Sequence, residues 1–264
     1  MESIERWIGH SRMSDPAGHA AGIADLSPKV GVLNDIIQGV LIHADWLSAY
    51  GMDEAQLDPA SRTTLPIAQR LEQIFARDTR ALDVKRSPAG RSIGTCRDFA
   101  LLLCSILRSQ GVPSRLRCGF SAYLGDGWED HWVCEYWDRQ AQAWRLSDPQ
   151  LDVVLQARLR ITFDPTDVPR RSFMTAGQVW LDCRAGKSDP DRFGHGETNG
   201  LWFVMVNVFR DHYVLNNRET STWDTWRAAP EATRVVNDQD APLLDNIATR
   251  PEQPLIEINP DWLA

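Results

Sequence analysis

Three residues in the middle of the chain, Cys96, His131 and Asp148, are of the types that serve as a nucleophile, a general base and an orienting carboxylate. A cysteine thiolate attacks carbonyl carbon atoms, a histidine takes and returns the proton, and a carboxylate holds the imidazole in one tautomer. Together they predict a nucleophile, a base and an orienter that could form a catalytic triad. Each residue alone also has a structural interpretation, as a buried cysteine, a surface histidine or a turn-forming aspartate.

Cys96 opens an almost wholly apolar segment, CRDFALLLCSILRS, which predicts a central buried helix. Thr95 is the expected N-cap with Asp98 in the capping-box position, and Gly111 and Pro113 end the helix. A thiol at the first helical residue faces free backbone N–H groups and the positive end of the helix dipole. That field contributes only about 0.3–1 kcal/mol, so strong activation also requires a cation, and histidine is the usual choice.

Two alternating segments, HWVCEYW and AWRLSD, predict antiparallel strands joined by a four-residue loop. With Trp137 opposite Gln142, this register sets His131 opposite Asp148, within reach of its carboxylate. A slip of one residue would put the two side chains on opposite faces. Asp152 is the alternative carboxylate, and the predicted register favours Asp148.

These segments together resemble the transglutaminase-like superfamily. GTCRDFALLLCSILRSQGVPSRLRCGF is similar to its glycine-x-cysteine-arginine-aspartate-phenylalanine-alanine helix and the following turn into a strand. DHWVCEYWD resembles its histidine-x-tryptophan-valine strand, and AWRLSDPQ resembles its tryptophan-x-x-x-aspartate-proline strand. The resemblance covers roughly residues 65–150, and the C-terminal part is similar to an extension found in bacterial members.

The resemblance implies a papain-like α+β fold, with Cys96 as nucleophile, His131 as general base and acid, and Asp148 as orienter. Members of this family cleave or form amide bonds through an acyl-enzyme thioester, and the acyl group passes to water or to an amine. Some members have lost the triad and act as scaffolds, whereas this chain keeps all three residues. No cofactor is implied, because the regions that bind calcium in the animal enzymes have no counterpart here.

The rest of the chain is expected to surround this core. We predict a helical N-terminal region over 1–64, a catalytic core over 65–165, and a mixed, mainly helical C-terminal extension over 166–264 that completes the same globule and the cleft. Periodicity predicts further helices over 29–51, 65–79, 173–186 and 200–217. The core itself, a cysteine-bearing helix packed on an antiparallel sheet, gives the α+β class.

Six further residues are candidates for substrate binding, because they are aromatic or polar side chains near the predicted core: Trp128, Trp132, Trp46, His43, Trp202 and Arg210. Trp128 and Trp132 flank His131, so one of them is expected to shield the site from water. Arg210 is expected either to pair with the adjacent Asp211 or to bind a substrate carboxylate.

The second oxyanion donor is the least defined part of the predicted site. The Cys96 N–H, at a helix start, is a natural first donor. A papain-like glutamine six residues before Cys96 is absent, since Gly90 occupies that position. Trp46 and His43 are the candidates for the second donor, and packing within the N-terminal region is their structural alternative.

Composition narrows the range of partners. The net charge of −8 and the pI near 5.3 argue against nucleic acid and anionic membranes as partners. There is no signal-peptide or membrane-spanning run, and the five cysteines lack the spacing of a disulfide framework, so a cytoplasmic location is expected. With no C-x-x-C or H-x-x-x-H pair, no metal site is expected.

The leading prediction is therefore a cysteine-dependent acyl transfer on amide or peptide bonds. The substrate would be a small molecule, a peptide, or a carrier-bound amide or thioester. One alternative is an amide-forming biosynthetic enzyme that takes its acyl group from a thioester donor. The other is a non-catalytic scaffold that uses its eleven tryptophans to bind a protein partner.

Overall fold

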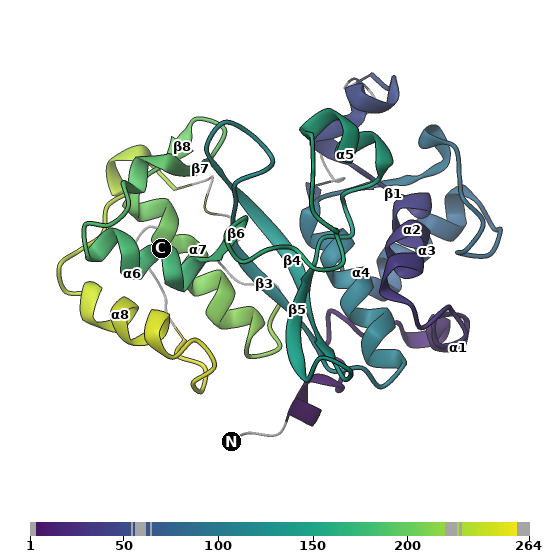
Figure 1. The fold of residues 1–264 in the computed structure, drawn as a ribbon, viewed down its shortest axis with the longest axis horizontal. Helices are drawn as coiled ribbons and strands as arrows, with labels where there is room; N and C mark the ends of the chain where they lie inside the picture. The colour runs from purple at the N-terminus through teal and green to yellow at the C-terminus, as the bar shows by residue number, and fades with distance from the viewer. Residues whose placement is uncertain are drawn as a thin grey trace. The chain divides into compact units, whose positions relative to one another are not determined.

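The structure is a computed structural model that describes residues 4–53, 55, 62–63, 65–219, 226 and 229–257. The chain divides into two compact units. Unit 1 is Met1–Leu116 with Trp132–Pro169, and unit 2 is Arg117–His131 with Arg170–Ala264. Strands β3 (Ser114–Ser121) and β4 (Trp128–Asp138) both run from one unit into the other (Figure 1). The fold is α+β, as the sequence predicts.

Unit 1 holds most of the helices of the N-terminal half and one end of the sheet (Figure 1). Besides parts of β3 and β4, its elements are α1 (Ala20–Ala24), α2 (Val30–Val40), β1 (Leu41–His43), α3 (Ile67–Arg77), β2 (Ser92–Gly94), α4 (Cys96–Ser109), β5 (Ala143–Ser147) and α5 (Val153–Leu159). Helices α1, α2 and α3 all pack against α4. Nearly every residue of α4 is buried, which confirms the predicted central helix.

The predicted start and end of α4 are also confirmed. The helix begins at Cys96, directly after the N-cap Thr95. At its other end Gly111 has a φ of +71°, in the left-handed region where glycine is favoured. The Val112 N–H donates to the Leu107 carbonyl at 2.8 Å, which closes the helix. Local signals in the sequence are therefore sufficient to place this element.

The prediction of one helix over 29–51 is wrong. Helix α2 ends at Val40, and the chain continues as strand β1 and then as a 3₁₀ helix, Ala44–Tyr50. Strand β1 pairs in parallel with β2, with Ile42 opposite Ile93. Both faces of this short strand are buried, so its apolar run carries no alternation that distinguishes it from a helix. The tertiary pairing decides the outcome.

The hairpin of β4 and β5 is antiparallel as predicted, but its register differs by two residues. Trp137 lies opposite Trp144, and Asp138 opposite Ala143 closes the loop. The Asp138 carboxylate accepts two N–H groups of the loop, and Gln142 has a φ of +51°. Both features move the turn one residue beyond the predicted position.

This register changes the expected position of Asp148. The last observed pair is Cys134 with Ser147, so the next position sets Asp148 opposite Val133. The predicted opposition of Asp148 to His131 is therefore wrong. Because the shift is two residues, each side chain keeps the face that was predicted for it.

Besides parts of β3 and β4, the described residues of unit 2 form the α-helices and short strands β6 (Phe173–Thr175), α6 (Ala176–Arg184), β7 (Phe193–His195), β8 (Thr198–Asn199), α7 (Leu201–Val214) and α8 (Ala241–Thr249). Helix α6 packs against α7 and α8 over an apolar core that includes Trp180 and Phe203. The helix predicted over 173–186 is preceded by β6, which pairs with the end of β3. Helix α8 was not predicted.

The sequence predicts an antiparallel sheet, whereas the observed sheet is mixed. Strands β5, β6 and β8 pair antiparallel with their neighbours, whereas β7 pairs in parallel with the first residues of β4. Gly119 of β3 is required by this packing, because a Cβ there would lie 2.1 Å from the Met174 carbonyl oxygen.

His212 of α7 fixes the segment that follows α8. Its Nε2 accepts the Ile256 N–H at 3.0 Å, so the proton is on Nδ1, which donates to the Pro251 carbonyl at 3.0 Å. Burial lowers the pKa of His212, and the carbonyl bond and Asp211 oppose this shift. The folded protein therefore prefers the neutral ring, and a proton on Nε2 would break the Ile256 bond.

We expect His212 to make unit 2 less stable in acid. Since the folded pKa lies below the unfolded value of about 6.5, its stabilising contribution is complete above that pH and is lost as the pH falls below it. The melting temperature measured between pH 7.5 and pH 5 should fall less steeply in His212→Gln than in wild type. His19→Gln, a change at a more accessible histidine, is the control; equal slopes in all three proteins would contradict this assignment.

Candidate active site

Cys96 is held at the N-terminus of α4 with its side chain half-buried. Cys104, Cys118 and Cys134 are fully buried, and Cys183 is the other half-buried cysteine. As the first helical residue, Cys96 has a backbone N–H that no carbonyl of its own helix can accept. The thiol is therefore accessible, and it lies next to a donor suited to a developing oxyanion.

Asp98 fixes this helix start through the backbone before it. Its Oδ2 accepts the Thr95 N–H at 2.8 Å, as the predicted capping box requires. Gly94 precedes Thr95, and a Cβ on Gly94 would lie 2.8 Å from the same Oδ2. Glycine is therefore needed here for the carboxylate to approach the backbone, and the sequence G-T-C-x-D is one local unit.

Arg70 of α3 holds the other carboxylate oxygen of Asp98. Its Nε and Nη2 donate to Asp98 Oδ1 at 3.2 and 2.9 Å, and its Nη1 donates to the Ile93 carbonyl at 2.8 Å. Both side chains are about 1% exposed. Burial raises the pKa of Asp98, and Arg70 and the Thr95 amide act in the opposite direction. This pair joins α3, β2 and the start of α4.

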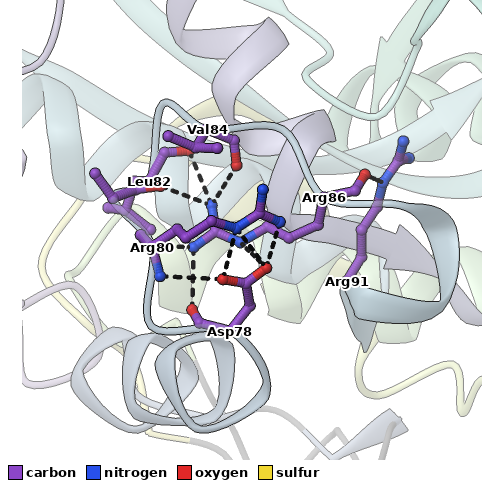
Figure 2. Close-up of polar contacts among 7 residues, drawn as sticks. Asp78, Arg80, Leu82, Val84, Arg86 and Arg91 are labelled. Atoms are coloured by element: carbon purple, nitrogen blue, oxygen red, sulfur yellow. Dashed lines mark hydrogen bonds and ion pairs between the residues drawn. The ribbon is translucent and has the colours of Figure 1, made fainter.

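The loop between α3 and β2 is organised around one buried arginine, Arg86. Figure 2 shows its guanidinium among the carbonyl groups of the loop, of which Arg80 and Val84 accept at 2.6 and 2.8 Å. The Arg86 carbonyl in turn accepts from Arg91 Nε at 3.3 Å. The Arg80 guanidinium bonded to Asp78 holds the pKa of that carboxyl below its usual range. The loop thus delivers Arg91 and β2 to fixed positions.

Asp148 follows the last residue of β5 and is about 1% exposed. Its N–H donates to the Pro165 carbonyl at 2.8 Å, and its Oδ1 accepts the Gln150 N–H at 3.0 Å. Asp152, the alternative carboxylate, is the N-cap of α5 and accepts two N–H groups with its Oδ1. Asp152 is therefore already committed to the start of a helix.

His131 is the last residue of β4 that belongs to unit 2, and it is also about 1% exposed. Its ring meets that of Tyr123 edge to face, with 5.9 Å between ring centroids. The next residue, Trp132, belongs to unit 1 and packs under the Arg97 guanidinium, which lies 4.2 Å from its ring centroid. Both side chains are fixed by aromatic contacts.

The remaining binding candidates of unit 1, His43 and Trp46, lie at the end of β1 and directly after it. His43 ends β1 and caps the 3₁₀ helix after it, because its Nδ1 accepts the Asp45 N–H at 3.1 Å. Trp46 lies in that 3₁₀ helix, half-buried, with the Arg158 guanidinium 5.9 Å from its ring. His43 lines a narrow cleft of unit 1 together with Arg91 and Gln150, and Trp46 does not line it.

The tryptophan candidates of unit 2 are packed into its core. Trp128 stacks on Phe193 with 5.7 Å between centroids. Trp202 is buried in α7 and meets Trp226 edge to face at 6.2 Å. Their aromatic faces are therefore used within the fold.

Arg210 and Asp211 make separate ion pairs and not one with each other. Arg210 Nη1 lies 3.2 Å from Asp130 Oδ2. Asp211 accepts from Arg117 Nε and Nη2 at 3.0 and 2.7 Å. Both are buried, so the structure gives neither an open face toward a substrate.

Sequence reasoning missed four residues that surround the start of α4 or line the cleft of unit 1: Arg70, Tyr50, Arg91 and Gln150. Burial, followed by the charge of Asp152, raises the pKa of Tyr50. The only signal in the sequence for these residues was that Arg91 and Gln150 lie next to the motifs around Cys96 and Asp148.

Among the described residues, no cluster of three or more Cys, His, Asp or Glu side chains is arranged to hold a metal ion.

Within the part of the chain that the structure describes, no helix combines the length and apolar character needed to cross a bilayer.

Among the comparisons with known proteins, a family model matches the central part of the chain. Residues 62–149 match the transglutaminase-like superfamily. No curated protein matches the sequence. A candidate cysteine protease from Cytophaga hutchinsonii is similar in structure, with 15% identity and a TM-score of 0.37.

That similarity covers 57% of this chain and 43% of the other, so less than half of that protein is matched, and a TM-score this low does not establish a common fold. The family match, in contrast, includes Cys96, His131 and Asp148 and supports cysteine-based catalysis. The similarity to the transglutaminase-like superfamily thus covers residues 62–149 of the chain.

Proposed function

We propose that the protein is a cysteine-dependent acyl-transfer enzyme that acts on amide or peptide bonds, with Cys96 as nucleophile, His131 as general base and acid, and Asp148 as the residue that orients His131. The observation that carries the proposal is the position of Cys96 at the start of α4, accessible and fixed by the buried Asp98 and Arg70. The family match over residues 62–149 supports it.

The proposed reaction proceeds in two steps. His131 takes the proton of the Cys96 thiol, the sulfur bonds to the carbonyl carbon, and the C–N bond breaks as His131 returns the proton to the leaving amine. Water or a second amine then attacks the thioester, His131 takes its proton, and the C–S bond breaks to restore the thiol. The Cys96 N–H supports the oxyanion in both steps.

This proposal predicts an acyl-enzyme on Cys96. With p-nitrophenyl acetate as probe, we expect a burst of p-nitrophenol and one acetyl group on Cys96 by intact-mass and peptide analysis. Hydroxylamine should release that group as a hydroxamate, since an amine can take the place of water. The burst should persist in Cys183→Ala, which removes the other half-buried thiol, and should disappear in Cys96→Ala.

Acetylation distributed over other cysteines, or an undiminished burst in Cys96→Ala, would contradict the proposal. In that case the protein would be better described as a member of the family that has kept the fold without turnover.

A further inference from the structure

The ring of His131, the proposed general base, is contacted by a residue of the loop that joins β3 to β4. This loop comprises residues 122–127, and Tyr123 is its second residue. The two ring centroids lie 5.9 Å apart, with an angle of 86° between the ring planes. His131 is about 1% exposed, whereas Tyr123 is half-buried. The tyrosine thus reaches the solvent, and the imidazole that it contacts is almost completely enclosed.

The backbone on both sides of this contact has defined partners within unit 2. The Ala122 N–H, next to the tyrosine, donates to the Ser172 carbonyl at 2.9 Å. Asp130, next to the histidine, forms an ion pair with Arg210 of α7, with 3.2 Å between Oδ2 and Nη1. Each ring is therefore attached to an anchored backbone position, and the edge-to-face arrangement is part of the fold of unit 2.

An aromatic neighbour restricts a rotation that a histidine side chain otherwise has. The second side-chain torsion of histidine is broad, so the backbone alone does not set the plane of the ring. An edge-to-face pair of rings favours its own geometry by about two- to tenfold in population. A general base needs one ring nitrogen within hydrogen-bond reach of the proton that it takes. A contact that fixes the ring plane therefore supports the base without touching the substrate.

We propose that Tyr123 is a positioning residue for His131, whose ring plane it holds and which it keeps from bulk water. This inference rests on the proposed function, because the tyrosine acts through the base. An imidazole kept from bulk water is available to the Cys96 thiol and does not lose its proton to solvent. The ring of the tyrosine is the part that acts, so phenylalanine should replace it and alanine should not.

The first measurement follows His131 itself. The carbon-bound hydrogen between the two ring nitrogens of a histidine exchanges slowly with deuterium, and peptide mass analysis at pH 9 gives its rate for each histidine. We expect exchange at His131 to be several times faster in Tyr123→Ala than in wild type, and unchanged in Tyr123→Phe. His212 is the reference in the same sample, because both of its ring nitrogens are bonded within unit 2.

The second measurement is alkylation of Cys96 by iodoacetamide at pH 6. It should be about two- to tenfold slower in Tyr123→Ala than in wild type, because the population of the productive ring orientation falls by that factor. At pH 10, where ordinary thiols are ionised without help from a base, the two rates should be equal. Tyr123→Phe should retain the wild-type rate at both pH values.

Leu124→Ala is the matched control, because Leu124 is the next residue of the same loop and is also half-buried. It should change neither measurement. Tyr123→Leu, which removes the ring but keeps apolar volume, takes the place of the alanine variant if that variant does not fold. Equal effects in Tyr123→Ala and Leu124→Ala, or a loss in Tyr123→Phe as large as in Tyr123→Ala, would overturn the assignment to the ring.

The two measurements separate this inference from the proposed function. Faster exchange in Tyr123→Ala supports the hold on the ring even where His131→Ala leaves Cys96 unaffected, and only the proposed function then fails. Alkylation that depends on His131 but not on Tyr123 supports the proposed function and rejects the inference.

Discussion

Alkylation of Cys96 by iodoacetamide is expected to continue well below pH 7 in the wild-type protein and to lose that reactivity in His131→Ala. An ordinary cysteine is less than about 1% thiolate at pH 6. A proposed ion pair with His131 would keep the thiolate populated there. Removing the imidazole would take away the proposed proton acceptor of the Cys96 thiol. We therefore expect alkylation of Cys96 at pH 6 to be about tenfold slower or more.

The protein carries its own control for this measurement. Burial, with Asp182 and Asp189, raises the pKa of Cys183 to about 11, so this half-buried thiol should react slowly at pH 6 in every variant. His195→Ala is the matched histidine variant, because His195 lies in β7 and pairs with Glu129. It should leave the rate at Cys96 unchanged.

Peptide mass analysis over pH 5 to 10 gives the two cysteine profiles from one sample. Profiles of Cys96 that coincide in wild type and His131→Ala would mean that His131 does not activate the thiol in the free protein, and the role of general base would then have to be abandoned.

The parts of the fold that the sequence predicts well are those with local signals. The start of α4 depends on Thr95 and Asp98, three residues apart, and its end on Gly111, so a short stretch of sequence contains all of the information. Strand β1 lies at the other extreme. Its apolar run continues that of α2, and only its pairing with β2, about fifty residues later in the chain, makes it a strand.

The hairpin shows why a nearly correct prediction still misplaces a candidate site residue. Loop length was predicted correctly, but the Asp138 side chain binds the loop amides and Gln142 takes a left-handed backbone, neither of which the residue types specify. The register consequently shifts by two, and Asp148 faces Val133 in the extended ladder. A simple count of loop residues cannot resolve such a shift.

The polar residues around the start of α4 could not be predicted, because their partners are distant in sequence. Arg70 and Asp98 are separated by 28 positions, and a basic residue in an amphipathic helix normally lies on the solvent face. The lack of a described hydrogen-bond partner for Gln150 Oε1 is likewise a property of the folded chain, which the sequence does not specify. Types and spacing give the candidate nucleophile, and only the structure gives what holds it.

Replacement of Arg70 by methionine is expected to be the most destabilising single change near the candidate site. Arg70 and Asp98 are both about 1% exposed, and Arg70 also donates to the Ile93 carbonyl. Removing one member of a buried ion pair leaves the other charge without compensation, which costs about 3–5 kcal/mol. The loss should be visible in urea unfolding followed by tryptophan fluorescence.

The pH dependence of this loss distinguishes the ion pair from packing. Without Arg70, burial of Asp98 is opposed only by the Thr95 amide and Arg97, so the folded pKa of Asp98 lies still further above the unfolded value. A carboxyl with a raised pKa destabilises the fold as the pH rises through that value, and the penalty is absent in acid. The difference in unfolding free energy between wild type and Arg70→Met should therefore be smaller at pH 4.5 than at pH 7.

Two matched variants complete the argument. Arg77→Met removes an exposed arginine from the same helix and should change stability little, because the side chain makes no buried ion pair. Arg70→Lys keeps the charge but loses the two-pronged contact with Asp98, so its loss should be intermediate. A penalty in Arg70→Met that is the same at both pH values would assign Arg70 to packing alone. The Thr95 and Asp98 cap alone would then position Cys96, and Arg70 of α3 would not contribute.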